Sequence, residues 1–160
     1  GARRWAWAAC EERRPSLCEM PPWWHLRDGR AYRVFAQPVT YEEAERGCVG
    51  LGARVHLATI TSAAEAAEVD DVISRDITTY PVLWLGGVRR GPRRALVWST
   101  GEPFAWTRFA PRQPDDFDGR QDCLALDIKT RAWHDRYCDS RYQAVCEREP
   151  QTSTKPSGPR

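Results

Sequence analysis

The first pattern of hydrophobic and polar positions in the chain is that of a strand leading into a helix. Residues 31–36 alternate polar and apolar side chains, as a half-buried strand does. Thr40 stands three residues before Glu43, a spacing typical of the capping box at a helix N-terminus. The pattern therefore predicts a strand at 31–36 and a helix from 41 to about 51, with Cys48 facing the core.

A second helix and a series of short strands are expected to follow. Residues 56–60 have the composition of a short strand, and Ser62 with Glu65 three residues later marks the start of a second helix. Further along, apolar runs punctuated by glycines predict strands at 82–87, 95–98, 124–128 and 142–146. Two helices followed by short antiparallel strands indicate the α+β fold class. A long loop spans about residues 100 to 121, a length that is typical of functional loops.

Composition mainly excludes several classes of partner and site. The 160 residues fit one domain large enough to bury a sizeable core. A formal net charge of +2 is too small to indicate a nucleic acid partner, and no run approaches the roughly 20 apolar residues of a membrane span. Six cysteines without a Cys-X-X-Cys pair predict disulfides rather than zinc, and therefore an extracellular setting. No secretory signal peptide is visible, so we interpret the chain as a mature fragment or an excised domain.

The N-terminal segment repeats a spacing that is found again near the C-terminus. The spacing from Trp5 to Cys10 and then Cys18 equals that from Trp133 to Cys138 and then Cys146. Two interpretations follow. Residues 1–20 are either the last strand of a preceding similar domain in a tandem array, or a hairpin of this domain closed by a Cys10–Cys18 disulfide. The complete domain is expected at 21–149, and the polar residues 150–160 are expected to form a flexible linker.

A series of residues in register resembles the C-type lectin domain family over roughly residues 21 to 149. The series comprises Tyr32, Cys48, Trp84, Leu85, Gly86, Trp98, Gly101, Trp106, Pro111, Gln113, Pro114, Asp115, Cys123, Trp133, Asp135, Cys138, Cys146 and Glu147. The resemblance implies the C-type lectin-like fold, with two helices, short antiparallel sheets and a long ligand-binding loop. It also implies two disulfides, Cys48–Cys146 and Cys123–Cys138.

The resemblance further implies a Ca²⁺ ion on the long loop that also coordinates sugar hydroxyls. Carried over by position, the places for metal and ligand are Gln113, Asp115, Gln121, His134 and Asp135. The Gln-Pro-Asp order resembles galactose-type members, Pro114 is implied to be cis, and Phe117 stands where galactose binders can place an aromatic ring. Gln121 replaces an expected Glu and His134 an expected Asn, so we expect weakened Ca²⁺ binding. The histidine would also make the site sensitive to pH near 6.5.

Arginines stand in the acidic places of the family's auxiliary Ca²⁺ site. We expect Arg89 and Arg93 to pair with Asp116 and Asp122 and so to replace an ion there. The basic patch also suits sulfate, phosphate or carboxylate, and its candidate anion-binding residues are Arg89, Arg90, Arg93 and Arg94. The simpler interpretation of the same cluster, and the one we favour for a single group of arginines, is a solvated charged hairpin.

Three classes of function remain. The first, which we take as the lead prediction because the Gln-Pro-Asp loop is intact, is a lectin that binds galactose-type sugar through a weakened Ca²⁺ site. The second is a calcium-independent module that binds a protein or an anionic, sulfated ligand. An enzyme is disfavoured, since His134 and Asp135 are adjacent on a strand and point to opposite faces. We expect an extracellular recognition domain, secreted or part of a receptor ectodomain, that does not itself insert into a membrane.

Overall fold

The computed structural model describes residues 24–25, 29–75 and 81–150 of the chain. The predicted N-terminal segment 1–20, the Cys10–Cys18 disulfide and the linker beyond Pro150 therefore lie outside the described residues. Within these ranges, neither helix has the length and apolar character that crossing a membrane requires.

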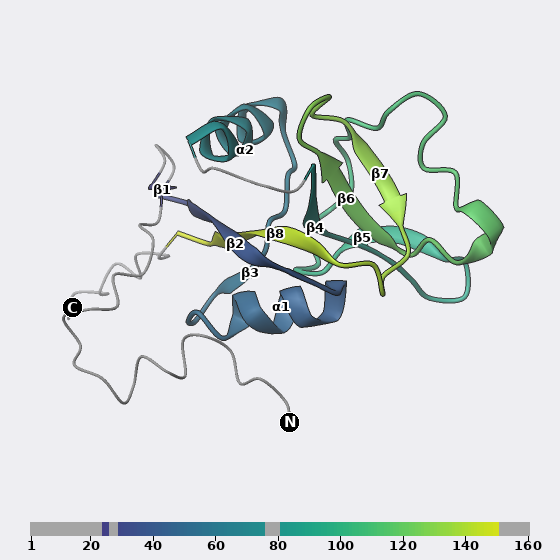
Figure 1. Ribbon diagram of the computed structural model, residues 1–160, viewed down its shortest axis with the longest axis horizontal. Coiled ribbons are helices and arrows are strands. Elements are labelled where there is room, and N and C mark those ends of the chain that lie inside the picture. Colours follow the sequence, from purple (N-terminus) through teal and green to yellow (C-terminus); the bar gives the residue numbers. More distant parts are fainter. Residues whose placement is uncertain (1–23, 26–28, 76–80, 151–160) are drawn as a thin grey trace, which may run out of the picture.

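One mixed sheet and two helices make up the described chain (Figure 1). The helices are α1 (Tyr41–Val49) and α2 (Ala63–Arg75). The strands are β1 (Trp24–His25), β2 (Ala31–Val39), β3 (Val55–Leu57), β4 (Val82–Arg90), β5 (Ala95–Trp98), β6 (Cys123–Asp127), β7 (Trp133–Arg136) and β8 (Tyr142–Arg148). The strand order is β1-β2-β8-β4-β6-β7, with β3 paired to β8 and β5 paired to β4.

The pairing of β8 gives the sheet its mixed character. β8 lies between β2 and β4, and it is antiparallel to β2 but parallel to β4. The other pairs are antiparallel, as the hydrophobic pattern predicts. A parallel pair joins strands far apart in sequence, so it leaves no local signal such as a hairpin turn. The α+β class with two helices is confirmed.

The predicted helix starts are confirmed by their capping contacts. The amide of Glu43 donates to the Thr40 hydroxyl (3.3 Å), and the Thr40 amide donates to the Glu43 carboxylate (3.0 Å). The amide of Glu65 donates to the Ser62 hydroxyl (3.2 Å) at the start of α2. α1 ends at Val49, two residues earlier than expected. The two helices lie on opposite sides of the β2–β8 pair in Figure 1.

The core is divided between the two faces of the sheet. One cluster packs α2 and the base of the long loop against Trp98 and Trp133, and the other packs α1 around Trp84. The ring of Trp133 meets that of Trp106, from the long loop, edge to face at a centroid distance of 5.4 Å. Trp84, Trp98 and Trp133 are almost completely buried, so they belong to the scaffold and are not ligand platforms. Apolar side chains thus anchor the loop to the sheet.

Both disulfides implied by the family resemblance are present. Cys48–Cys146 joins α1 to β8, with the two Cα atoms 5.4 Å apart. Cys123–Cys138 joins the start of β6 to the chain just after β7, with Cα atoms 5.2 Å apart. The second bridge therefore fixes the end of the long loop to the strand that carries His134 and Asp135.

Candidate functional site

The long loop connects the end of β5 to the start of β6 and forms the right-hand edge of the molecule in Figure 1. The Gln113–Pro114 peptide bond is cis, as the resemblance implies. Beyond it, Asp116 (φ 44°) and Asp118 (φ 54°) adopt left-handed conformations, which aspartate tolerates better than most residues. These turns produce the short 3-10 helix η2 (Phe117–Gly119) at the tip.

Asp135 lies at the centre of the site. Burial alternates along β7, so that Trp133 and Asp135 point into the protein while His134 and Arg136 are half-exposed. The Asp135 side chain has no exposed surface. Its Oδ1 accepts a hydrogen bond from the Asp115 amide (3.1 Å), and its Oδ2 accepts one from the Asp116 amide (2.8 Å). The two amides orient the loop segment that follows the cis proline.

Arg89 of β4 supplies the positive charge for this buried carboxylate. Its Nη2 donates to Asp135 Oδ2 (2.9 Å), its Nε donates to the carbonyl oxygen of Gln121 (3.2 Å), and its Nη1 donates to that of Arg94 (3.3 Å). The Nε atom also lies 3.9 Å from Asp116 Oδ1. One guanidinium therefore joins the sheet, the β4–β5 turn and the end of the long loop.

Arg94 completes the arrangement from the β4–β5 turn. Its Nη2 donates to both carboxylate oxygens of Asp116 (2.8 and 3.1 Å) and lies 2.8 Å from Asp122 Oδ1. The prediction that Arg93 pairs with these aspartates is wrong. The backbone turns at Gly91 (φ 73°) and Arg94 (φ 50°), so that Arg94, the residue after Arg93, reaches the loop instead. We call the following residues the loop clamp: Arg89, Arg94, Asp116, Asp122 and Asp135.

The predicted Ca²⁺ ligands do not form a shell that fits the ion as they are arranged. Asp135 is already bonded to Arg89 and to two amides, and the Gln121 side-chain oxygen accepts from the Phe117 amide (3.2 Å). Asp115 is exposed. Among the described residues, no three acidic, histidine or cysteine side chains are grouped so that they could hold a metal. One feature does favour a ligand, since the side-chain oxygen of Gln113 is buried without a hydrogen-bond partner.

His134 contributes little positive charge to this region. Burial lowers its pKa, and the neighbouring Arg136 lowers it further, although Asp127, Asp135 and Asp115 act in the opposite direction. The imidazole therefore titrates below its ordinary range, rather than near pH 6.5 as the sequence alone suggests.

The four candidate anion-binding arginines do not form one patch. Arg89 and Arg94 are inside the loop clamp, whereas Arg90 and Arg93 are exposed. Ion pairs within the described part of the chain include neither Arg90 nor Arg93. Of the four candidates, Arg90 and Arg93 are therefore the two whose guanidinium groups are exposed and outside the loop clamp.

The tip of the loop presents an aromatic surface. Phe117, the residue predicted to offer an aromatic ring to a sugar, is 64% exposed. Nearby, the carboxylate of Asp118 accepts hydrogen bonds from Arg120 (2.5 Å) and from the hydroxyl of Tyr137 (3.3 Å). The hydrogen bond from Arg120 is the main cause of a lowered Asp118 pKa. The tip thus combines an exposed ring with a fixed carboxylate.

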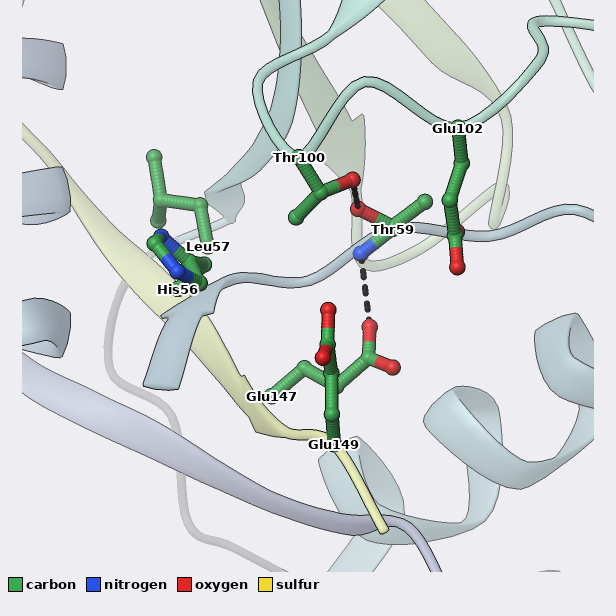
Figure 2. Close-up of a pocket in the computed structure, with 7 residues that line it drawn as sticks. All are labelled: His56, Leu57, Thr59, Thr100, Glu102, Glu147 and Glu149. Carbon is green, nitrogen blue, oxygen red and sulfur yellow. Dashed lines mark hydrogen bonds between the residues drawn. The ribbon is translucent and has the colours of Figure 1, made fainter. Parts of the chain in front are cut away.

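A second cluster of charges, not predicted from the sequence, lies near the start of β2. Arg30 is hydrogen-bonded to Glu147, and its Nη2 lies 3.3 Å from Glu65 and 4.0 Å from Glu102. The other Glu147 oxygen accepts from the Thr59 amide (2.8 Å), as Figure 2 shows. We call the following residues the terminal cluster: Arg30, Glu65, Glu102 and Glu147.

Burial raises the pKa of Glu147 to about 7, although the Thr59 amide and Arg30 both oppose the shift. Glu147 lines a pocket together with Glu102 and Glu149, which Figure 2 shows. The one sequence signal for the cluster is an acidic residue directly after Cys146, at the end of an apolar strand.

Comparison with known proteins identifies relatives over most of the described chain. The model of the Lectin C-type domain family matches residues 37–148. The alpha-N-acetylgalactosamine-specific lectin of Patiria pectinifera is 34% identical over 136 residues, which cover 79% of this chain and 78% of the relative. The C-type lectin CEL-I from Cucumaria echinata has 25% identity and a TM-score of 0.72, covering 82% of this chain and 96% of its own. A calcium-independent type II antifreeze protein also has 25% identity, with a TM-score of 0.68 over 82% of this chain and 94% of its own.

Proposed function

This chain belongs to the C-type lectin domain family, and on that premise we propose that it is an extracellular recognition module whose long loop binds its ligand without Ca²⁺. The observation that carries the proposal is the set of hydrogen bonds that the Asp135 carboxylate accepts. This buried carboxylate is bonded to Arg89 and to the amides of Asp115 and Asp116, so the loop is organised by the protein's own donors. The two disulfides favour an extracellular setting, where such bonds persist.

The ligand in this proposal is a protein or an anionic, sulfated glycan. Exposed Arg90 and Arg93 offer guanidinium forks, which suit sulfate and carboxylate groups. The exposed ring of Phe117 adds apolar contact area at the loop tip. A solved relative of this fold is described as calcium-independent, which supports the proposal that the fold can work without the ion. We propose no catalytic role, because recognition domains of this kind act by binding.

The lead sequence prediction, galactose-type sugar binding through Ca²⁺, is the second candidate. It is favoured by the unpartnered Gln113 oxygen, by exposed Phe117, and by a relative that is an alpha-N-acetylgalactosamine-specific lectin. The ion would supply a positive charge that attracts sugar hydroxyl oxygens, and the residues to hold it would be Gln113, Asp115, Gln121, His134 and Asp135. Asp135 would first have to exchange its bond to Arg89 for one to the ion.

A binding screen with and without EDTA decides between these candidates. The purified domain is applied to arrays of neutral glycans, sulfated glycans and extracellular proteins at pH 7.5. Retention in EDTA that is lost in the Arg90→Glu, Arg93→Glu double variant supports the calcium-independent module. Galactose binding that needs Ca²⁺ and is lost in Asp115→Ala supports the lectin and removes the first proposal.

The organisation of the longer chain is a separate proposal. We propose that residues 21–149 form the domain, that 150–160 are a linker, and that flanking domains of the same type complete a tandem array. Mass mapping of Cys10 and Cys18 tests the N-terminal end. A clean bridge between them indicates a hairpin of this domain, whereas free or intermolecularly bonded Cys10 and Cys18 indicate the last strand of a preceding domain.

A further inference from the structure

Glu147 is linked to the start of the long loop by two sets of contacts. Its carboxylate accepts a hydrogen bond from the Thr59 amide (2.8 Å), and the Thr59 hydroxyl lies 3.2 Å from the hydroxyl of Thr100, at the beginning of the loop. The Arg30 guanidinium bonds to the other Glu147 oxygen and lies 4.0 Å from Glu102 of the same loop segment. Figure 2 shows the two threonines and the two glutamates around one pocket. A change of charge at Glu147 can therefore reach the loop.

The Glu102 carboxylate is only partly engaged by other groups. Its side chain is 33% exposed, and among the described residues its buried Oε2 atom has no hydrogen-bond partner. Arg30 Nη2 lies closer to Glu65 (3.3 Å) than to Glu102 (4.0 Å). Glu65, however, is already held by the amide and the hydroxyl of Thr61 (2.6 and 2.8 Å). Of the carboxylates around Arg30, Glu102 is therefore the one least constrained by other hydrogen bonds.

Glu147 is the carboxylate of this cluster whose charge changes near neutral pH. Its side chain is only 4% exposed, and burial raises its pKa to about 7. The charged or titratable groups around it come from every neighbouring segment, and they are Arg30, Tyr32, His56, Glu65, Glu102 and Glu149. Arg30 is the one arginine in this set, so the carboxylates compete for its charge. Once Glu147 is neutral, it no longer attracts Arg30 as an ion, and the other carboxylates gain by the difference.

We propose that the terminal cluster is a pH-sensitive latch on the long loop, in which the gain of a proton by Glu147 transfers Arg30 to Glu102. At pH 8 Arg30 is bonded to Glu147, as in the structure, and Glu102 is held loosely. At pH 6 Arg30 pairs with Glu102 and so joins the start of the loop to the beginning of β2. Neutral Glu147 still accepts the hydrogen bond from Thr59. This inference rests on the proposed function, because it gives a loop that works without Ca²⁺ a control by proton concentration.

The test is a double-mutant cycle of Arg30→Ala and Glu102→Gln, measured by urea denaturation at pH 8 and at pH 6 in EDTA. We expect the pair to change the unfolding equilibrium constant by less than about 1.5-fold at pH 8 and by about two- to fivefold at pH 6, the range of a partly exposed ion pair. The same cycle in the Glu147→Gln background is the control, since a neutral residue there should give the larger coupling at both pH values. Equal coupling at pH 8 and pH 6 with native Glu147 overturns the inference.

Hydrogen exchange keeps the inference testable if Arg30→Ala does not fold. The Gly101 amide donates to the carbonyl oxygen of Trp98 (3.0 Å), so its exchange reports local opening at the start of the loop. We divide each rate by the intrinsic rate at the same pH. From pH 8 to pH 6, the protection of Gly101 should then rise about two- to fivefold more in the native protein than in Glu102→Gln. An equal rise in the two proteins overturns the inference.

The matched control for the exchange experiment is Glu42→Gln. It also neutralises a glutamate, but the Glu42 side chain is 82% exposed on α1, away from the terminal cluster, so its protection should rise as in the native protein. Neither measurement involves a ligand or a metal. Failure of the latch therefore leaves the proposed function intact, and loss of ligand retention in EDTA overturns the proposed function without altering either result.

Discussion

The terminal cluster and the loop clamp are both built from ion pairs between arginine and carboxylate side chains, but they hold different parts of the molecule. In the terminal cluster, one arginine faces three glutamates that come from α2, from the chain after β5 and from β8. In the loop clamp, two arginines face three aspartates from the long loop and β7. Both clusters join segments that are distant in sequence, and each adjoins a disulfide. Glu147 follows Cys146, and Asp122 precedes Cys123.

The difference lies in what the buried carboxylates are bonded to. Glu147 accepts a hydrogen bond from the Thr59 amide, which belongs to the buried scaffold beside β3. Asp135 accepts hydrogen bonds from the amides of Asp115 and Asp116, which belong to the loop itself. The terminal cluster therefore stabilises the framework, whereas the loop clamp shapes the surface. Disruption of the first should lower global stability, and disruption of the second should loosen the loop locally.

Removal of the two disulfides, one at a time, should give the largest losses in the free energy of unfolding. Cys48–Cys146 closes a loop of 98 residues and Cys123–Cys138 one of 15. Constraint of the unfolded chain predicts a loss of about 4.7 kcal/mol for the Cys48→Ser, Cys146→Ser variant and about 3 kcal/mol for the Cys123→Ser, Cys138→Ser variant. Urea denaturation without reductant measures both. A larger loss from the short bridge would contradict the division into framework and surface.

Replacement of Arg30 in the terminal cluster should have the next largest effect on the free energy of unfolding. Arg30→Ala leaves Glu147, which is only 4% exposed, without its counter-charge. A buried charge without its partner costs about 3 kcal/mol, and we expect that loss in the free energy of unfolding at pH 8. Arg46→Ala is the control, because Arg46 is 71% exposed and should cost less than about 0.5 kcal/mol. Equal losses in the two variants would show that the cluster has no special role in the framework.

Glu147 should also give the terminal cluster a pH dependence. Its pKa is raised to about 7 in the folded protein from an ordinary value of 4.5, so the folded state binds the proton more tightly than the unfolded state. The resulting stabilisation is complete below pH 4.5 and is lost as the pH rises through about 7. Between pH 8 and pH 6 we expect a gain of about 1 kcal/mol. Denaturation in both buffers should show this gain in the native protein and lose it in Glu147→Gln.

Arg94→Ala should have the smallest effect on global stability. The Arg94 side chain is 40% exposed, so solvent screening limits its ion pairs to about 0.5 kcal/mol. Its loss should instead release Asp116, whose carboxylate also accepts from the Gln121 amide (3.2 Å). Hydrogen exchange at Gln121 should therefore become faster than in the control Arg93→Ala. Unchanged exchange together with a large fall in melting temperature would place the loop clamp in the framework.

The sequence was sufficient to predict elements whose signals are local. The pairing of Thr40 with Glu43 and the Ser62 cap located the starts of both helices. Family resemblance located both disulfides and the cis Gln113–Pro114 bond. In each case, a few neighbouring residues or a fixed order of motifs is enough to specify the structure.

The charge clusters could be predicted only in part, because they depend on contacts between segments that are distant in sequence. Arg89 and Arg93 were both expected to replace an ion, but Arg94 takes the second place because of the backbone conformation of the β4–β5 turn. The pairing of Arg89 with Asp135 requires β4, β6 and β7 to lie in register. Arg30 and Glu147 are 117 residues apart, and no periodicity links them.

The covalent attachment of Arg89 to β4 has a consequence for how the loop responds to its surroundings. An ion that can dissociate is lost on dilution or chelation, so a loop that depends on it follows the ion's concentration outside the cell. A tethered group instead has an effective local concentration that is fixed by the length of its linker and is in the millimolar range or above for short linkers. Its occupancy therefore does not change with the medium. Ligand release from such a loop would be governed by the dissociation rate of the ligand itself, not by the supply of calcium.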